Sequence, residues 1–321
     1  MLPIVCQRNQ SLIFVHQPHA KEKRQSVLDI GVGIADNEYT QESYRTGGKR
    51  MIRESESSRV NSVTKALRIL ECFTTATPEM TLTQLSRELD MPKSTLLNLL
   101  RTLEEAGYVY RTRQSQSYRL GFKIMELSYS MRSAFPIVQF ALPLMEEMQL
   151  ATGEFIYLTT HINGRVLYLE CVYPRKRTVG YSITGKTLPM HCTGCGKAML
   201  SLFTTEQVDS VIKTWGLERK TLNTITDRNA LLRELESSRI RGYALDQEEE
   251  TPGVKCIAMP VRASDGSAAG AISISGPVYS MTDDQMSKYI KLLSDITSIL
   301  ATRADLFPAM QIDSPFIGIG V

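Results

Sequence analysis

The chain has 321 residues, which is enough for two domains of ordinary size. A hydrophobic content of 42% and a charged content of 22% exclude a protein that is disordered throughout. The net charge of +3 is unevenly distributed: residues 49–123 carry 13 Lys and Arg against 8 Asp and Glu, a net of +5, and residues 124–321 carry 19 against 21, a net of −2. This pattern favours a polyanion-binding module joined to a domain with another role, although chance can produce it on a solvated surface.

Six cysteines are scattered along the chain, and the N-terminal residues offer only the short apolar run SLIFV. We therefore expect no signal peptide and no disulfide framework. No apolar run approaches the roughly 20 residues of a membrane span. The sequence predicts a cytoplasmic protein with reduced thiols, no membrane association and no cofactor.

Both ends of the chain have the composition of tails. Residues 1–57 lack helical and strand periodicity and predict a disordered segment, and residues 307–321 predict a flexible tail. The run GGKRM, which ends at Met51, would be encoded by guanine-rich codons ahead of an ATG, as a bacterial ribosome-binding site is. We therefore expect translation to begin at Met51.

Two helices are predicted after the tail. The segment NSVTKALRILECF places apolar side chains at i, i+3, i+4 and i+7, namely Val63, Ala66, Leu67 and Leu70. This spacing predicts a helix that buries those residues and has Asn61 or Ser62 as its N-cap. Thr81 stands three residues before Gln84, a capping-box pattern that predicts a second, short helix through Leu89.

A third helix and a hairpin follow. Asp90 and Met91 suit a turn, Pro92 suits the first position of a helix, and Gly107 suits the position just past its end. One face of this helix is expected in the core: Leu96, Leu99, Leu100 and Leu103. Residues 108–120 alternate as a β-hairpin does. Three helices and a basic hairpin are typical of a winged helix-turn-helix.

The second helix of such a motif meets bases and phosphates in the major groove, and the wing lies along the backbone or enters the minor groove. We therefore assign DNA contacts to Lys93, Ser94, Thr95, Asn98, Arg101, Arg111 and Arg113. Asn98 suits adenine and Arg101 suits guanine, whereas Lys93 and Ser94 suit phosphates. The alternative is a core helix pair with a solvated polar face, since only some helix pairs bind DNA.

The remaining residues predict a mixed domain. A helix is expected near 121–134, another ending at Gly153, a hairpin around Asn163-Gly164, helices at 194–203 and 227–242, a strand pair with its turn at Asp265-Gly266, and a last helix from Asp283 to Leu306. Helices and strands that do not alternate strictly predict an antiparallel α+β domain over residues 135–306.

Several polar positions in this second domain suit a binding site. The run HCTGCGK places small residues and backbone N–H groups ahead of a helix, where an anion can bind. Ser273 and Ser275 share one strand face and can donate hydrogen bonds from it. Each also has a plain structural explanation: the serines as solvent-facing strand residues, Cys256 as a buried apolar residue and Asp246 as a turn cap.

The segment LTQLSRELDMPKSTLLNLLRTLEEAGYV, followed by YRLG, is similar to the winged helix-turn-helix of the IclR family of bacterial transcription regulators. LPMHCTGCGKAML resembles that family's pocket loop and helix, and GYALDQEEETPGVKCIAMPV with GAISISGP resembles its C-terminal signature. The resemblance covers about residues 61–306. It departs at Asp90, where the family usually has glycine, and at Arg262, where an aromatic residue often stands.

The resemblance implies a winged helix-turn-helix at 58–120, a linker helix at 121–134 and a GAF-like effector domain. It implies an effector pocket formed by Thr193, Gly194, Cys195, Asp246, Cys256, Ser273 and Ser275. Amides and hydroxyls suit a carboxylate, and an aspartate suits a hydroxyl or hydrated carbonyl. We therefore expect a non-enzymatic regulator of a catabolic operon that binds a small hydroxy or keto acid, such as a sugar-acid catabolite. The sequence fits a repressor and an activator equally. A homodimer or dimer of dimers is expected on a double-stranded operator, because one recognition helix reads too few bases.

A second hypothesis rests on His191, Cys192 and Cys195, a CxxC with an adjacent histidine that suits a metal or redox sensor. No second CxxC or HxxxH accompanies it in the sequence. A thiol hydrolase that uses Cys192 or Cys195 with His191 is a weaker alternative, because neighbours in sequence seldom face each other.

Overall fold

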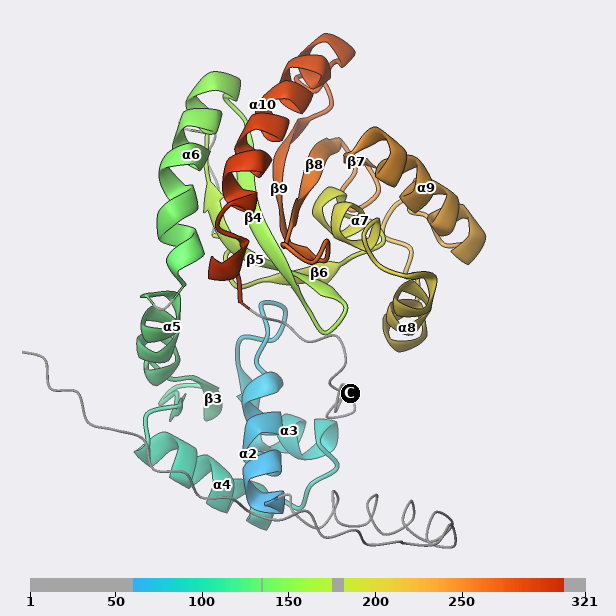
Figure 1. Ribbon diagram of the computed structural model, residues 1–321. Helices are drawn as coiled ribbons and strands as arrows, with labels where there is room; N and C mark the ends of the chain where they lie inside the picture. Colours follow the sequence, from blue (N-terminus) through green and yellow to red (C-terminus); the bar gives the residue numbers. More distant parts are fainter. Residues whose placement is uncertain (1–59, 134, 175–181, 309–321) are drawn as a thin grey trace, which may run out of the picture. The chain divides into compact units, whose positions relative to one another are not determined.

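The structure, a computed structural model, describes residues 60–133, 135–174 and 182–308 (Figure 1). The predicted N-terminal tail, the expected start at Met51 and residues 309–321 of the C-terminal tail lie outside these ranges. Within them, no helix has both the length and the apolar character that a membrane crossing needs.

The N-terminal part contains three helices and a small antiparallel sheet. The helices are α2 (Asn61–Glu71), α3 (Leu82–Glu88) and α4 (Lys93–Glu105). The sheet has the strand order β1-β3-β2, with β1 at Met80–Thr81, β2 at Val109–Arg111 and β3 at Ser117–Leu120. Its core includes Ile69, Leu85, Leu96 and Leu100, none of which is exposed to solvent. The predicted helices and hairpin are present, and β1, only two residues long, is an element that the sequence did not indicate.

The local signals around the helix-turn-helix act as the sequence predicts. Thr81 and Gln84 form a capping box at the start of α3. Asp90 adopts the left-handed conformation with φ of 46°, which aspartate tolerates better than most residues. Gly107 follows the end of α4 with φ of 79°. Pro92 is one residue off the prediction, because it is the N-cap of α4 and not its first residue.

The prediction for α2 is wrong in its cap and in its buried face. The N-cap is Val60, and no side chain caps the helix. Val63 is 54% exposed and Leu67 is 47% exposed, whereas Ile69 is fully buried. Residues 66, 69, 70 and 73 also have the i, i+3, i+4, i+7 spacing, and this neighbouring stripe is the one that faces the core. Periodicity alone could not choose between two overlapping stripes.

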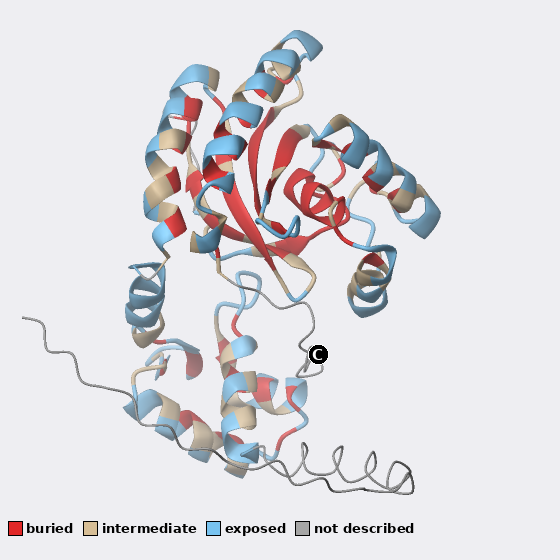
Figure 2. Cartoon of the chain, viewed as in Figure 1, coloured by how far each residue is buried: buried red, intermediate tan, exposed pale blue. Residues whose placement is uncertain are grey.

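Two helices lead into the second part of the chain. The predicted linker helix is α5 (Lys123–Ser133), and none of its described residues is buried (Figure 2). The next helix, α6 (Pro136–Thr152), ends at Gly153, which is left-handed with φ of 70° as its predicted role requires.

A six-stranded antiparallel sheet forms the centre of the second part, in the order β6-β5-β4-β9-β8-β7. The strands are β4 (Phe155–Ile162), β5 (Arg165–Val172), β6 (Thr187–Pro189), β7 (Ala244–Gln247), β8 (Val254–Arg262) and β9 (Ala268–Pro277). Asn163 and Gly164 both have positive φ in the predicted two-residue hairpin turn. A β-bulge lies between Val261 and Arg262, where the sequence departs from the family pattern. The two edge strands, β6 and β7, were not predicted.

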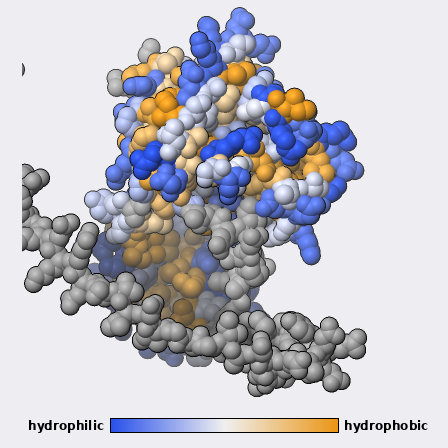
Figure 3. All heavy atoms as spheres, viewed as in Figure 1, coloured by the Kyte–Doolittle hydropathy of each residue, from blue (hydrophilic) through white to orange (hydrophobic). Residues whose placement is uncertain are grey.

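Helices cover both faces of this sheet (Figure 1). One face packs on α6 and on α10 (Asp283–Ala301), and the other packs on α7 (Gly194–Leu200), with α8 (Thr205–Trp215) and α9 (Arg228–Arg241) outside it. Ile257 belongs to the first core, and its strand neighbours Cys256 and Ala258 belong to the second, as strand alternation requires. The outward side of α9 is largely hydrophilic (Figure 3). The fold is the predicted antiparallel α+β type, and α8 is an additional helix.

Thr81→Ala is expected to lower the free energy of unfolding by about 1 kcal/mol, because its hydroxyl accepts the Gln84 N–H at the start of α3. Urea denaturation followed by circular dichroism measures the loss. Thr102→Ala is the control: its hydroxyl contacts only the Asn98 carbonyl on the exposed side of α4, so a change within about 0.5 kcal/mol is expected. Equal losses in the two variants would contradict the capping role.

Candidate functional site

The polar face of α4 lies opposite its buried leucines. Lys93, Ser94, Asn98 and Arg101 are exposed, and Thr95 is half-buried. Neither Lys93 nor Arg101 takes part in an ion pair with another described residue. No side chain caps the first turn of α4, so its amide N–H groups are also directed outward. The face therefore presents unpaired cations, amides and short polar side chains together.

The wing contains three arginines in different environments. Arg111 and Arg113 are exposed, and the Arg111 guanidinium lies 5.8 Å from the ring centre of Tyr118. Arg119, which the sequence reasoning did not assign to DNA, pairs with Glu79 at 2.9 Å. Hydrogen bonds from Arg119 and Ser117 lower the pKa of Glu79. Arg119 is therefore already matched by a carboxylate, whereas the guanidinium groups of Arg111 and Arg113 form no ion pair among the described residues.

A pocket of about 260 Å³ lies between the N-terminal end of α7 and the sheet. All the pocket residues predicted from the sequence line it except Ser273: Thr193, Gly194, Cys195, Asp246, Cys256 and Ser275. Strand pairing brings them together, because Cys256 is opposite Asp246 on one side and opposite Ser275 on the other. Residues from four separate segments therefore share one wall.

Ser273 is fully buried and does not line this pocket. It lies opposite Ala258 on β8 and opposite Tyr157 on β4, in the middle of the sheet. Its hydroxyl oxygen makes no hydrogen bond among the described residues. Ser273 therefore stands behind the pocket wall and not on its surface.

Two glycines allow α7 to lie directly on the strands. A Cβ on Gly194 would stand 2.9 Å from the Cys256 sulfur, and a Cβ on Gly196 would stand 2.3 Å from the Met190 carbonyl oxygen. The Thr193 hydroxyl accepts from the Gly196 amide at 3.2 Å and donates to the Pro189 carbonyl at 3.0 Å. Since Thr193 caps only the third amide of the helix, the first two amides, of Gly194 and Cys195, remain at the pocket wall.

Asp246 combines two of the roles considered for it. Its carboxylate accepts the Glu249 amide at 2.7 Å, which caps the turn after β7, and the same side chain lines the pocket. Burial raises the pKa of Asp246 to about 7, although the hydrogen bond from Glu249 acts in the opposite direction. The carboxyl group therefore titrates near neutral pH, well above the range of an exposed aspartate.

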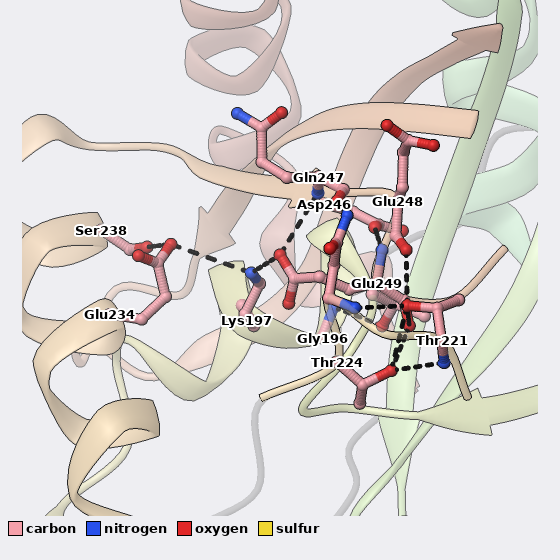
Figure 4. A network of polar contacts seen from close by, with 12 residues as sticks. Gly196, Lys197, Thr221, Thr224, Glu234, Ser238, Asp246, Gln247, Glu248 and Glu249 are labelled. Carbon is pink, nitrogen blue, oxygen red and sulfur yellow. Dashed lines mark hydrogen bonds and ion pairs between the residues drawn. The ribbon is translucent and has the colours of Figure 1, made fainter. Parts of the chain in front are cut away.

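A buried ion pair lies behind Asp246 (Figure 4). The ammonium group of Lys197 on α7 is 1% exposed, 2.5 Å from Glu249 Oε1 and 3.8 Å from Glu234 Oε1 on α9. The hydroxyl of Thr224 donates to the Glu249 carbonyl at 2.7 Å. These contacts hold the acidic segment 248–250 against α7 and thereby fix one wall of the pocket.

The sequence reasoning missed several lining residues, among them Tyr157, Tyr168, Ile183, Lys186, Leu188, Glu250, Thr251 and Val254. The rings of Tyr157 and Tyr168 meet edge to face at 5.2 Å, and burial raises both hydroxyl pKa values. Alternation along β4 and β5 was a usable signal for these tyrosines. It is disturbed by the bulge between Leu158 and Thr159, which changes the pairing of the two strands.

The CxxC segment is buried and its thiols are protonated. Burial raises the pKa of Cys192 to about 12 and also raises the pKa of Cys195 and of Cys256. His191 contacts the Glu218 carbonyl through Nε2 at 3.0 Å. Across residues 60–133, 135–174 and 182–308, no group of three or more His, Cys, Asp or Glu side chains could hold a metal ion. The geometry therefore gives no support to a metal centre or a reactive thiolate here.

Gly194→Ala is expected to destabilise the domain by about 1–3 kcal/mol, because its methyl group would meet the Cys256 sulfur. Adding Cys256→Ala removes that sulfur, so the double variant should lose at least ~0.5 kcal/mol less than the sum of the two single variants. Urea denaturation of the four proteins measures this coupling. Cys171→Ala, a buried thiol on β5, is the matched control and should be additive with Gly194→Ala; coupling of equal size there would contradict the predicted contact.

Both parts of the chain match known proteins. Residues 62–113 match the family described as "IclR helix-turn-helix domain", and residues 130–301 match "Bacterial transcriptional regulator IclR C-terminal". The HTH-type transcriptional regulator XynR of Escherichia coli is 30% identical over 254 residues, which is 78% of this chain and 99% of XynR.

Solved structures agree with these matches. An IclR transcriptional regulator of Silicibacter sp. TM1040 has a TM-score of 0.66 and 27% identity, over 77% of this chain and 99% of that one. An IclR homolog of Microbacterium hydrocarbonoxydans, solved with 4-hydroxybenzoate, shares the fold with a TM-score of 0.64 and 23% identity, over 76% of this chain and 99% of that one. Since the family matches extend over the recognition helix and over the pocket, the chain belongs to the IclR family and is an IclR-type DNA-binding transcription regulator.

Proposed function

We propose that a small hydroxy or keto carboxylate, such as a sugar-acid catabolite, occupies the pocket beside α7 and changes the binding of this regulator to the operator of a catabolic operon. The observation that carries the proposal is the composition of the pocket wall. Two free amides, at Gly194 and Cys195, stand beside Ser275, two tyrosines and Asp246 around one volume of about 260 Å³.

The groups on this wall suit the two ends of such an acid. The amides at the start of α7 and the ammonium group of Lys186 can bind a carboxylate. Hydroxyls and Asp246 can bind an oxygen on the neighbouring carbon atom. The volume admits only a small ligand. The Microbacterium homolog was solved with 4-hydroxybenzoate, a small carboxylate whose hydroxyl group lies across the ring, and this supports a small carboxylate as the ligand.

We assign the DNA contacts by the environment of each side chain. Asn98 and Arg101 are exposed along α4 and suit base edges. Lys93 and Ser94 lie at the uncapped end of the helix, where amide N–H groups add to a phosphate site. Thr95 can add a contact to either group, and Arg111 and Arg113 bind the backbone or minor groove from the wing.

We also propose that the protein acts as a homodimer or a dimer of dimers. The helix α5 has no buried residue, and Met125, Leu127, Tyr129 and Met131 on it are exposed. Apolar side chains gathered on one exposed helix favour contact with a second copy. Two copies would also double the number of bases read. Ligand binding would then act by favouring one of two arrangements of the DNA-binding parts.

Fluorescence anisotropy tests the central proposal. The full chain is titrated onto labelled DNA from upstream of its own gene and onto random DNA, with and without a pool of small hydroxy and keto acids. Specific binding to the operator DNA that an acid strengthens or weakens is the expected result. For the proposed oligomer, sedimentation equilibrium of the same sample should give a multiple of the 36.0 kDa chain mass. Specific binding that responds only to zinc or to an oxidant would favour a sensor built on Cys192 and Cys195. The absence of specific binding would contradict the DNA assignment.

The roles of two arginines can be separated. Arg101→Ala should lose discrimination between operator and random DNA by about 1–3 kcal/mol, because its proposed contact is to a base. Arg113→Ala should weaken binding to both DNAs alike and reduce the salt slope by about 0.9, because its proposed contact is to a phosphate. Arg119→Ala is the matched control and should change little, since Glu79 already pairs with that arginine. Identical behaviour of Arg101→Ala and Arg113→Ala on both DNAs would contradict the assignment.

A further inference from the structure

Asp246 is a buried acid on the pocket wall with no cation of its own. Its side chain is 6% exposed, and it forms no ion pair with any described lysine or arginine. Backbone amides of the next turn are its hydrogen-bond partners, with Glu249 N at 2.7 Å. Neutral amides and a coulombic attraction from Lys197 favour the carboxylate form of this acid, but they compensate its burial incompletely.

The groups around Asp246 explain why little positive charge is available to it. The strand β8 presents Cys256 and the start of α7 presents Cys195, both of which are neutral thiols, as is Cys192 ahead of that helix. The following turn adds two negative residues, Glu249 and Glu250. The buried cation on α7, Lys197, lies 2.5 Å from Glu249 and 3.8 Å from Glu234, so two carboxylates already share its charge. Lys186 lines the pocket but is exposed to solvent.

A ligand carboxylate would enter this environment as a further negative charge. The pocket would then hold the ligand, Asp246 and Glu250 together, with the exposed Lys186 as the one lysine or arginine among the described lining residues, and like charges there disfavour each other. Protonation of Asp246 removes one of these charges. It also turns the carboxyl group into an O–H donor, and an O–H donor to a carboxylate forms a short, strong hydrogen bond.

We propose that Asp246 receives the effector in its protonated form and donates a hydrogen bond to it, so that binding of the anion is coupled to uptake of a proton. This inference rests on the proposed function of the same pocket. It gives Asp246 a role in specificity. A neutral carboxyl group can donate a hydrogen bond to a carboxylate or keto oxygen, but it offers no negative charge that would bind an ammonium group. The proton is readily available near neutrality, since burial raises the pKa of Asp246 to about 7.

The coupling predicts how the response depends on pH. With one proton taken up and a pKa of about 7, an acid should act about tenfold more weakly at pH 8 than at pH 6. The Asp246→Asn variant carries a permanent donor and cannot ionise. It should keep the response that the wild-type protein shows at pH 6 and should lose the difference between the two pH values.

The experiment measures the concentration of acid that half-reverses operator binding, by anisotropy at pH 6 and at pH 8. The probes are pyruvate, glycolate and D-gluconate, which are ionised at both pH values. Three proteins are compared: the wild type, Asp246→Asn and Glu250→Gln. Glu250→Gln removes a different negative charge from the same pocket but leaves Asp246 able to bind its proton. It should therefore keep the tenfold difference in acid concentration between pH 6 and pH 8 that Asp246→Asn loses.

Ligand-free stability supplies a second readout. The pKa of Asp246 is raised in the folded state above its value in the unfolded chain, so its contribution to stability is complete at low pH and is lost as pH rises through about 7. Urea denaturation should therefore show Asp246→Asn gaining stability relative to the wild type between pH 5 and pH 8. A difference that stays constant over this range would mean that Asp246 ionises normally, and this would overturn the inference.

The remaining outcomes separate the two proposals. An acid that acts equally at pH 6 and pH 8 on the wild type would leave the proposed function standing and would overturn the proton coupling. Loss of the response at both pH values in a stably folded Asp246→Asn would show that the carboxylate itself binds the effector, which also overturns the coupling. If none of the three acids alters operator binding at either pH, the proposed function fails for this ligand class and the coupling fails with it.

Discussion

The close approach of α7 to the sheet is the constraint from which the rest of the second domain follows. All seven residues of this helix are buried, and its first turn lies against β8 because Gly194 has no Cβ to meet the Cys256 sulfur. A helix this close to the strands directs its first amides along the sheet surface and leaves a pocket at its N-terminal end.

The same close packing excludes solvent from Lys197, whose ammonium group would be strongly destabilised without a partner. The acidic turn after β7 therefore has to fold back onto α7 to supply Glu249. One packing contact in this way determines the pocket, the buried ion pair and the position of the turn that carries Asp246.

Much of the local structure could be predicted because its signals lie within a few residues of one another. The capping box at Thr81, the left-handed Asp90 and the Asn163-Gly164 turn each need only neighbouring backbone atoms. The errors occur where a choice depends on distant residues. The buried stripe of α2 is decided by the core it meets, and the short edge strands β6 and β7 exist only because longer strands are present beside them.

The pocket shows the same limit. Its predicted residues came from the resemblance to a family, and spacing alone left the plain structural explanations open. Tyr157 reaches the pocket because β4 pairs with β9, a strand more than 100 residues later, and Phe155 and Tyr157 thereby lie opposite Ser275 and Ser273. The burial of Lys197 was not predicted, because nothing local indicates that its partner comes from a turn 52 residues further along the chain. The signal that existed was a lysine within a helix of otherwise small and apolar residues.

The two parts of the protein place their charged side chains in opposite environments, exposed to solvent in one and buried in the other. The proposed DNA-binding face keeps Lys93 and Arg101 exposed and without carboxylate partners among the described residues, so counterions surround them and ionic strength would act on the contacts proposed for them. Beside the pocket, Asp246, Lys197 and Glu249 are buried away from water, where salt screens charges little and the protonation state has a large effect on the energy. Under the proposed assignments, salt acts mainly on DNA binding, and protons act mainly on ligand binding. The proposed coupling would let the regulator respond to a metabolic acid and to a proton at one site, while ionic strength adjusts its affinity for the operator at another.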